Sequence, residues 1–585
     1  MLVQATGTLV VSPGGSVLAY RNDERTCVPA DMVRSLETRT HRALGGAVHD
    51  HVRTIFIDLG ELEAGLADWV FPDRDGIHPL TTILRQAAFG AAQSLLGSWK
   101  RDAVTRDKGL VELQRTLERL QLTPLPPSVK IRVSEGYAYY GLHPETYAVA
   151  ATRFAAEQRP SRTVCLGIRS IGTSLSAVVG AALDSAGVQV QLHTVRPHGH
   201  PFDRQLHLDG VLRDALRAAA SDSHFAVVDE GPGLSGSSFT SVVRALGELG
   251  VAASRIALFP SWRADPAALR SDEARRVWST TCAYTADAGA AGFGVDEIAG
   301  PGSVDFSGGA WRPHLLGDGS RAWPAVQPQH EVAKARVPDR GCIVRFAGLG
   351  RYGASKLERA ERLAAGGFGV RPGALQSGYL TLPFVAGQPC TRATPDLVDR
   401  IADHIAFVVG AFPATRSPSV DELEHMTTTN IGLGLEGAPV PDLARFRGPL
   451  GDAPCAAIDG RMLPHEWIDT GSAGYWKVDA LDHHADHFFP GIQDAAWDIA
   501  AAAFEFGLEP AAVDRLVTRY ASASGDRGVR VRLPFYDLAY PAFRLGYATL
   551  ARGSVQGTPD ADRFDAVIAR CVTRLRERVN LPSAP

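Results

Sequence analysis

Two adjacent carboxylates, Asp229 and Glu230, end a short apolar run and precede a turn rich in glycine and serine. Residues 225–228 are predicted to form a buried strand, and residues 241–249 have the pattern of a helix. Acids at the end of such a strand can hold the hydroxyls of a ribose or the shell of a Mg²⁺ ion. The N–H groups and hydroxyls of the turn, with the following helix N-terminus, can hold a phosphate. The segment therefore predicts a binding site for a phosphorylated sugar.

Residues 225–238 resemble the ribose-phosphate signature of type I phosphoribosyltransferases, which bind phosphoribosyl pyrophosphate (PRPP). The resemblance implies that Asp229 and Glu230 are catalytic, holding the ribose hydroxyls and stabilising a cationic transition state. The turn after the acids is one residue longer than is usual in that family. An ordinary parallel sheet can also end a strand in Asp-Glu before a glycine-rich turn, and this alternative stays open. The turn residues implied to grip the 5′-phosphate are Gly233, Ser235, Gly236, Ser237 and Ser238.

A second segment, residues 163–174, repeats this order of strand, small-residue turn and helix. Phosphoribosyltransferases carry a comparable loop that receives the pyrophosphate, and an arginine in it would add a charge-assisted contact. Residues 196–204, between the two segments, are polar and basic and could close over a polyanion, with an ordinary surface turn as the alternative. The residues that the resemblance assigns to ligand binding here are Arg169, Ser170, Gly172, Thr173, Ser174 and Arg196.

A third group of chemically capable residues follows residue 336. Its segments are residues 342–346, 348–353, 355–365, 379–385, 457–467, 474–482 and 493–500. Their order is similar to that of the aminoglycoside-phosphotransferase branch of the kinase-like fold. Phosphoryl transfer needs a carboxylate that orients the acceptor hydroxyl, a cation on the nucleotide phosphates and ligands for Mg²⁺. The resemblance implies that Asp459 is the catalytic acid and Asp479 the main metal ligand, with His465 near the position of a metal-binding Asn.

The same resemblance implies a phosphate-binding cation, either Arg345 or Lys356, oriented by Glu358 or Glu361. No His-Gly-Asp or His-Arg-Asp precedes Asp459, and the Asn is absent, so a kinase-like domain without catalysis is an alternative. Asp494 and Asp498 are expected to brace the domain. In the run 482–487, His483 and His487 are four residues apart, as in a helix-borne metal pair. The run could instead be solvated, or assist Asp479.

The elements that position these residues follow from the apolar pattern. Residues 126–262 alternate short apolar strands with helices, which predicts a doubly wound parallel sheet covered on both faces. Residues 336–585 are expected to form an α+β kinase-like two-lobed domain, which makes the chain an α/β multidomain protein. Residues 1–125 are an N-terminal α/β accessory region, and residues 263–335 an irregular connection. The pattern predicts strands at 54–59, 130–133, 342–346 and 379–385. It predicts helices at 80–96, 110–120, 355–365, 511–521, 535–551 and 564–579.

Bulk properties narrow the possible environments. A chain of 585 residues should contain several domains. The net charge of −4 gives no reason to expect nucleic-acid or membrane-surface binding. No apolar stretch approaches the ~20 residues of a membrane span, and no signal segment is recognisable. The seven scattered cysteines show no CxxC spacing, which favours a reducing cytoplasm.

Together these features predict a bifunctional transferase of small-molecule metabolism. It would carry out Mg²⁺-dependent phosphoribosyl transfer from PRPP and ATP-dependent phosphorylation of a small-molecule hydroxyl. It would bind small-molecule substrates, and the sequence leaves open whether the chain forms a homodimer. One alternative is a ligand-sensing regulatory protein with a PRPP-binding domain and a pseudokinase. Another is a phosphoribosyl hydrolase or phosphorylase, with water or phosphate as the nucleophile.

Overall fold

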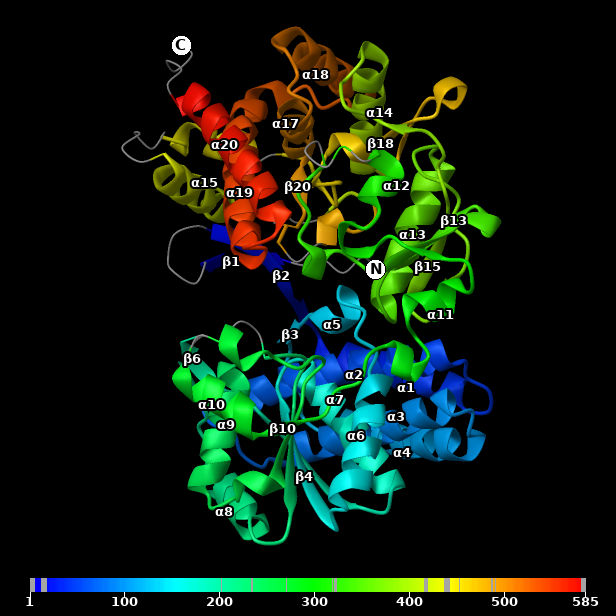
Figure 1. Cartoon of the computed structure of the whole chain (residues 1–585), viewed down its shortest axis with the longest axis vertical. Helices are drawn as coiled ribbons and strands as arrows, with labels where there is room; N and C mark the ends of the chain where they lie inside the picture. Colours follow the sequence, from blue (N-terminus) through cyan, green and yellow to red (C-terminus); the bar gives the residue numbers. More distant parts are fainter. Residues whose placement is uncertain are drawn as a thin grey trace.

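Figure 1 shows two halves stacked along the long axis of the molecule. The lower half contains the N-terminal helices and the parallel sheet, and the upper half contains the C-terminal helices. The computed structural model describes residues 6–11, 18–200, 203–232, 235–269, 271–317, 319, 323–414, 419–435, 442–451, 453–485, 488–489 and 491–579.

The predicted parallel sheet is present in the lower half. Its strands lie in the order β10-β9-β8-β4-β5, with every neighbouring pair parallel. The chain leaves β4 for β5 on one side and then returns to β8 on the other, so the carboxyl ends of β4 and β8 form the switch point at which such sheets bind ligands. The strands are β4 (Arg162–Ile168), β5 (Gln189–Val195), β8 (His224–Val228), β9 (Ile256–Phe259) and β10 (Cys282–Ala283).

Helices cover both faces of this sheet because alternate strand residues point to opposite sides. On β8, Phe225 and Val227 belong to the core formed with α8 (Gly210–Ala219) and α9 (Ser237–Glu248). Ala226 and Val228 belong to the core formed with α6 (Glu145–Gln158) and α7 (Gly172–Ser185). The predicted doubly wound sheet is thus confirmed. It also extends beyond residue 262, since β10 is its edge strand.

The N-terminal region adds a helical layer to the α6–α7 face. The core on that face continues into α1 (Pro29–Ala43), α2 (His49–Val70), α3 (Pro79–Trp99) and α4 (Ala103–Gln121). The helices predicted at 80–96 and 110–120 are confirmed. The strand predicted at 54–59 is wrong, because these residues lie inside α2. This helix is buried on nearly all sides there, and a short apolar run on such a helix has no period that distinguishes it from a strand.

A three-stranded antiparallel sheet joins the two halves. It contains β1 (Thr6–Val11), β2 (Leu18–Cys27) and β3 (Val129–Arg132), which is the strand predicted at 130–133. β3 pairs with β2 and lies outside the parallel sheet to which it was assigned. β2 also contacts two helices of the upper half, α15 (Val420–Gly434) and α19 (Val529–Ser554), as Figure 1 shows.

The upper half consists of two lobes. The smaller lobe is an antiparallel sheet in the order β11-β12-β13-β15-β14, packed with α13 (Arg351–Ala365). The strands and helix predicted at 342–346, 379–385 and 355–365 are confirmed within a few residues. The sheet begins before residue 336. Its strands are β11 (Val304–Asp305), β12 (Lys334–Val337), β13 (Cys342–Phe346), β14 (Leu375–Gln376) and β15 (Tyr379–Pro383).

The larger lobe is helical around one apolar core, in which Trp497 is buried among aromatic rings of α19. The three helices predicted near the C-terminus are confirmed as α18, α19 and α20. The helices of this lobe are α14 (Pro395–Ala411), α15, α16 (Arg447–Gly451), α17 (Ala495–Glu505), α18 (Pro510–Ser524), α19 and α20 (Pro559–Val579). Its short strands are β16 (Gln388–Pro389), β17 (Cys455–Ala456), β18 (Trp467–Asp469), β19 (Tyr475–Lys477) and β20 (Gln493–Asp494).

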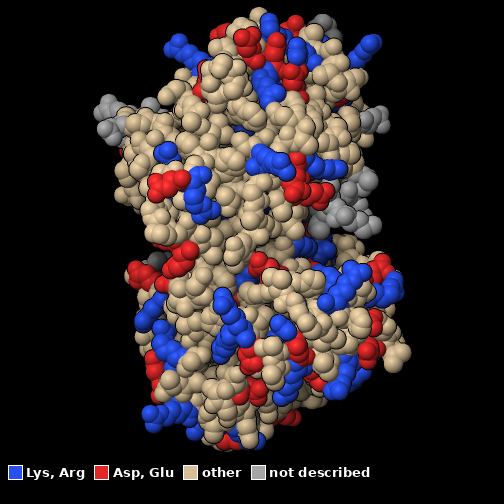
Figure 2. Space-filling view, turned by 90° about the vertical axis from the view of Figure 1, so that its right-hand side faces the viewer, with Lys and Arg blue, Asp and Glu red and all other residues tan. Residues whose placement is uncertain are grey.

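Short elements complete the described chain. They are α5 (Glu135–Ala138), β6 (His198–His200), β7 (Asp203–Gln205), α10 (Asp272–Thr280), α11 (Val295–Ala299) and α12 (Arg312–Leu316). All seven cysteines are free thiols. Within the described ranges, no helix has both the length and the apolar character needed to cross a membrane. On the face shown in Figure 2, acidic and basic side chains are interspersed.

Candidate functional site

Asp459 lies at the centre of a buried polar group in the upper half. It follows β17, and its side chain is 0% exposed. Its carboxylate lies 3.1 Å from His483 Nδ1, 3.4 Å from Lys477 Nζ and 3.5 Å from His404 Nε2. Burial alone would raise the pKa of Asp459, but these basic groups hold it well below its usual value. Asp459 is therefore an ionised carboxylate held in a fixed position.

Asp498 binds the backbone of the loop that carries Asp459. This residue lies in the first turn of α17 and accepts hydrogen bonds from the N–H groups of Asp459 at 3.0 Å and Gly460 at 2.8 Å. Burial and the nearby Asp459 charge raise the pKa of Asp498 to about 7. Asp494, the N-cap of α17, accepts from Arg532 on α19 at 2.6 Å. Both aspartates thus brace the lobe, as the sequence predicted.

The smaller lobe contributes cations to the same region. Arg345 on β13 donates to Asp479 at 3.0 Å and pairs with Asp482. Lys356 on α13 lies 3.8 Å from Asp482. The two alternatives for the predicted cation, Arg345 and Lys356, therefore both lie beside Asp482, and Arg345 also contacts Asp479. Glu358 and Glu361, predicted as their partners, are instead exposed on α13.

Asp479 is the acid of this group that is partly exposed to solvent. It follows β19, and its side chain is 35% exposed, whereas Asp459 is enclosed. Burial would raise the pKa of Asp479, but Arg345 and His483 hold it below its usual value. A ligand arriving from solvent would therefore meet the ionised Asp479 first.

His465, predicted as a metal ligand, and its neighbour Glu466 have different surroundings. The His465 ring stacks on Trp311, with centroids 5.4 Å apart and planes 18° apart. Glu466 turns inward and accepts from Lys477 Nζ at 2.7 Å. Glu466, Asp479 and His483 each place one possible ligand atom within 4.8 Å of the others. His487, the other half of the predicted histidine pair, lies outside the described residues.

Sequence reasoning missed several members of this site. Lys477 and Glu466 stand on or beside short strands and carry no recognisable motif. Arg359 lies under the site, where it donates to the carbonyl oxygens of Ala480 at 2.7 Å and Ala457 at 2.8 Å. It therefore links α13 to the loops that carry Asp459 and Asp479. The only signal for Arg359 in the sequence was a cation at a position on the buried face of an amphipathic helix.

The second predicted site lies at the switch point of the parallel sheet. The loops after β4 and β8 touch there: a Cβ on Gly172 would lie 2.5 Å from the carbonyl oxygen of Val228 and 3.1 Å from Cα of Asp229. Burial raises the pKa of Asp229 to about 7. Tyr147 donates to the Asp229 carbonyl at 2.7 Å, and α5 packs close to the Glu230 carboxylate. The acid pair and the small-residue loop are thus adjacent, as predicted.

Both small-residue turns contain a residue with a positive φ. Gly236 has a φ of +65° and immediately precedes α9. Ser235 Oγ and Ser237 Oγ lie 3.0 Å apart, and Ser238 is in the first turn of α9. Gly233 lies outside the described residues. In the other loop, Ser170 has a φ of +149°, which a residue with a side chain rarely adopts.

Other residues of the β4 loop point into the protein. Thr173 and Ser174 are buried in the first turn of α7, and Ser174 Oγ lies 2.9 Å from the Tyr137 hydroxyl. Arg169 is also buried, and it pairs with Asp68 at 2.6 Å and Asp75 at 2.5 Å. This side chain joins the sheet to the N-terminal layer.

Arg196 shares the same acids. It pairs with Asp68 at 2.5 Å, and its backbone N–H donates to Asp75 at 2.7 Å. Carboxylates thus hold the guanidinium groups of both arginines. In this arrangement, Arg169 and Arg196 do not offer the contacts to a polyanion that were predicted for them.

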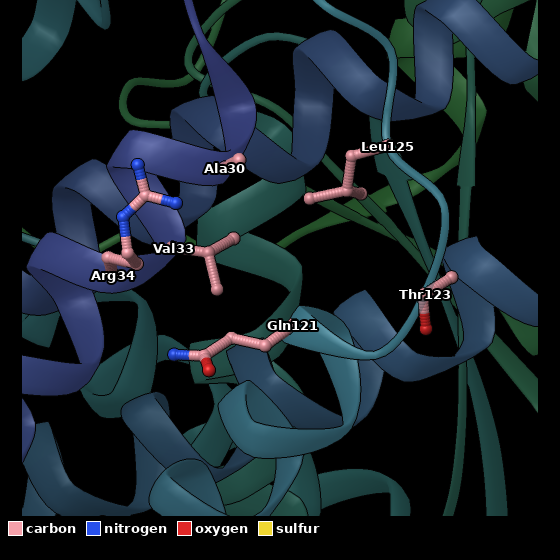
Figure 3. Close-up of a pocket in the computed structure, with 6 residues that line it drawn as sticks. All are labelled: Ala30, Val33, Arg34, Gln121, Thr123 and Leu125. Carbon is pink, nitrogen blue, oxygen red and sulfur yellow. The ribbon is translucent and has the colours of Figure 1, made fainter.

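A surface pocket elsewhere does not belong to either site. Figure 3 shows it between α1 and the end of α4. None of the predicted site residues lines it. The lining residues are Ala30, Val33, Arg34, Gln121, Thr123 and Leu125.

Comparisons with known proteins give matches among solved structures alone. No protein-family model and no curated protein matches the sequence. One similar structure is a choline/ethanolamine kinase family protein from Mesorhizobium loti, at 18% identity over 43% of this chain and 90% of that chain, with a TM-score of 0.29. Choline kinase LicA from Streptococcus pneumoniae matches at 16% identity over 42% and 89%, with a TM-score of 0.29. An aminoglycoside phosphotransferase from Alicyclobacillus acidocaldarius matches at 11% identity over 42% and 90%, with a TM-score of 0.27.

Proposed function

We propose that the upper half is a kinase-like domain that transfers phosphate from ATP to a hydroxyl of a small molecule. One observation carries this proposal: Arg345 and Lys356 of the smaller lobe meet Asp479 and Asp482 of the larger lobe, beside the braced Asp459 loop. Phosphoryl transfer requires cations for the phosphates, acids for Mg²⁺ and a positioned acid for the acceptor. All three are within one connected group.

The donor set fits a divalent cation. Glu466 and Asp479 each have one carboxylate oxygen held by a protein cation, Lys477 and Arg345 respectively. Their other oxygens would hold Mg²⁺, which when bound neutralises charge on the nucleotide phosphates. Arg345 and Lys356 would place positive charge beside the nucleotide phosphates while Arg345 keeps its contacts with Asp479 and Asp482. Asp459 is enclosed in this arrangement, so the acceptor hydroxyl would have to enter the group, where the carboxylate would orient it and accept its proton.

Turnover by the full chain tests the proposal. Release of ADP from ATP is measured with Mg²⁺ and a panel of amino alcohols, aminoglycosides, sugars and nucleosides. We expect an acceptor-dependent rate that falls about 10²–10⁴-fold in Asp459→Asn. Asp469→Asn, an exposed aspartate on β18, is the matched control and should keep the rate. An ATP-dependent rise in thermal stability without turnover on any acceptor would favour the sensor alternative instead.

A second candidate function concerns the parallel sheet. We propose that its switch point binds a phosphorylated ribose, with PRPP as the substrate for exchange of pyrophosphate at the anomeric carbon. The specific support is the contact between the β4 loop and the Asp229 loop, beside the start of α9. At a hundredfold excess over Kd, such a ligand should add about 2.7 kcal/mol to the unfolding free energy. A Mg²⁺-dependent thermal shift with PRPP that disappears in Asp229→Asn supports this candidate, and no shift refutes it.

A further inference from the structure

His483 is oriented by the enclosed Asp459. Its side chain is 6% exposed, and its Nδ1 lies 3.1 Å from Asp459 Oδ1. An ionised carboxylate accepts hydrogen bonds only, so Nδ1 must be the protonated nitrogen of the ring. The lone pair of a neutral His483 is then on Nε2, on the opposite side of the ring. A carboxylate that holds one imidazole nitrogen in this way is the usual support of a metal-binding histidine.

The other nitrogen faces two carboxylate oxygens. His483 Nε2 lies 3.7 Å from Glu466 Oε1 and 3.8 Å from Asp479 Oδ2. Both separations exceed a hydrogen bond but lie within the range of an ion pair. They also suit an ion about 2.1 Å from each of three ligand atoms.

The remaining oxygens of the two acids are held from outside the group. Glu466 Oε2 accepts from Lys477 at 2.7 Å, and Asp479 Oδ1 accepts from Arg345 at 3.0 Å. Each of the three side chains therefore has one atom fixed by the protein and a second atom turned toward the other two.

We propose that Glu466, Asp479 and His483 form a divalent-metal site in which His483 Nε2 is a direct ligand. Two carboxylates and an imidazole suit Mn²⁺ and other transition cations better than Mg²⁺, which prefers oxygen ligands. Asp459 acts on this site as a positioning residue through the imidazole. The inference concerns the same site as the proposed function, but metal binding is measured without nucleotide, so the two can fail separately.

Pulsed electron paramagnetic resonance of Mn²⁺ tests the ligand assignment directly. The full chain is titrated with Mn²⁺ in the absence of nucleotide, once with natural histidine and once with ¹⁵N-labelled histidine. We expect one saturable Mn²⁺ ion with a nitrogen coupling that changes with the label. Mg²⁺ should displace this Mn²⁺ only at a concentration at least tenfold higher.

Variants locate the nitrogen. His483→Gln should lose the coupling and bind Mn²⁺ at least tenfold more weakly. Asp459→Asn should keep the coupling and weaken binding about 10–100-fold, as expected when the orienting partner of a metal-bound histidine is changed. His465→Gln is the matched control, because this neighbouring ring stacks on Trp311 and should leave the coupling intact.

Two results would overturn the inference. One is saturable Mn²⁺ binding without a histidine-nitrogen coupling, which leaves His483 as a charged partner of the acids. The other is absence of saturable Mn²⁺ binding. Both are measured on the unmodified chain, so they hold even if a variant fails to fold.

Discussion

Lys477 is the residue on which the acids of the upper site depend. Its side chain is 0% exposed and lies 2.7 Å from Glu466 and 3.4 Å from Asp459. Burial alone would lower the pKa of Lys477, but the surrounding carboxylates raise it above its usual value. Buried carboxylates such as those of Asp459 and Glu466 are tolerated only while their counter-charge is present.

Removing that charge should be costly. Lys477→Met leaves Asp459 and Glu466 without their shared cation, and we expect a loss of about 3–5 kcal/mol in the free energy of unfolding, measured in urea. Lys130→Met, at a lysine whose side chain is 79% exposed, is the control and should change stability by less than about 0.5 kcal/mol. Equal effects of the two changes would contradict the role given to Lys477.

Asp229 predicts a dependence of stability on pH. Burial raises its pKa from 3.8 to about 7 in the folded chain. The folded state therefore binds this proton more tightly than the unfolded state, and the resulting stabilisation is complete below pH 3.8 and lost as the pH rises through 7. In Asp229→Asn, the unfolding free energy should fall less across this range. Urea denaturation at a series of pH values measures the difference.

An exposed carboxylate provides the comparison for that series. Asp214→Asn, on the surface of α8, should reproduce the pH profile of the original chain. The profile of Asp229→Asn should separate from both. If all three curves remain parallel, Asp229 is ionised throughout and the burial argument is wrong.

The family resemblance, rather than residue types or spacing, singled out Asp459, Asp479 and Arg345. The structure brings these three side chains into one connected polar group. The resemblance placed a metal ligand near His465, and the sequence does not show which of the neighbours His465 and Glu466 turns toward Lys477. That choice is made by the stacking of His465 on Trp311, a residue more than a hundred positions away. Long-range contacts of this kind leave no local pattern.

At the scale of elements, the tight turn after Asp459 is the sensitive point. Gly460 has a φ of +88°, and a Cβ at this position would lie 2.8 Å from the Phe489 ring. The turn therefore needs glycine for two reasons, its backbone conformation and the lack of space. Gly471 has a φ of +71°, but a Cβ there would have no other atom within 4 Å, so it needs glycine for the first reason only.

Comparing the two glycines separates these effects. Gly471→Ala should cost about 1 kcal/mol, the strain of a left-handed conformation. Gly460→Ala should cost about 1–3 kcal/mol more, since the Phe489 ring must move, and it should reduce turnover because Asp459 moves with the loop. Thermal unfolding and ADP release measure both quantities. Equal costs would show that the ring yields without strain.

Elements with a clear hydrophobic period were predictable from the sequence, and elements determined by long-range packing were not. The helices α3 and α13 and the strands β8 and β13 lie within a few residues of their expected bounds, whereas α4 begins at Ala103, before its expected start at residue 110. Residues 54–59 were assigned to a strand because large apolar residues predominate in them, whereas they lie within the buried part of α2. β3 was recognised as a strand but placed in the wrong sheet, because pairing with the distant β2 has no local signal.

At the scale of the whole molecule, α13 connects the two halves. Arg351 pairs with Asp58 and Glu61 of α2, and the Tyr352 hydroxyl accepts from the N–H of Ser134 at 3.2 Å. The same helix carries Lys356 and Arg359 of the upper site. The lower half therefore holds the helix that positions two cations of the proposed phosphotransferase.

This connection predicts cooperative unfolding. The full chain should unfold in one transition, with fluorescence and far-ultraviolet circular dichroism coincident in urea. Arg351→Leu leaves Asp58 and Glu61 without one of their cations, and we expect a loss of about 3–5 kcal/mol and a split into two transitions. Turnover should fall as well, because α13 is then held by the smaller lobe alone.

Arg362 on the same helix is the matched control. It is exposed and donates to the carbonyl oxygen of Ala411 within the upper half, at 3.0 Å. Arg362→Leu should therefore keep a single transition and the original rate. If Arg351→Leu also unfolds in one transition with full turnover, the halves are joined chiefly by the apolar core that continues from α2 to β13, and α13 is not the link.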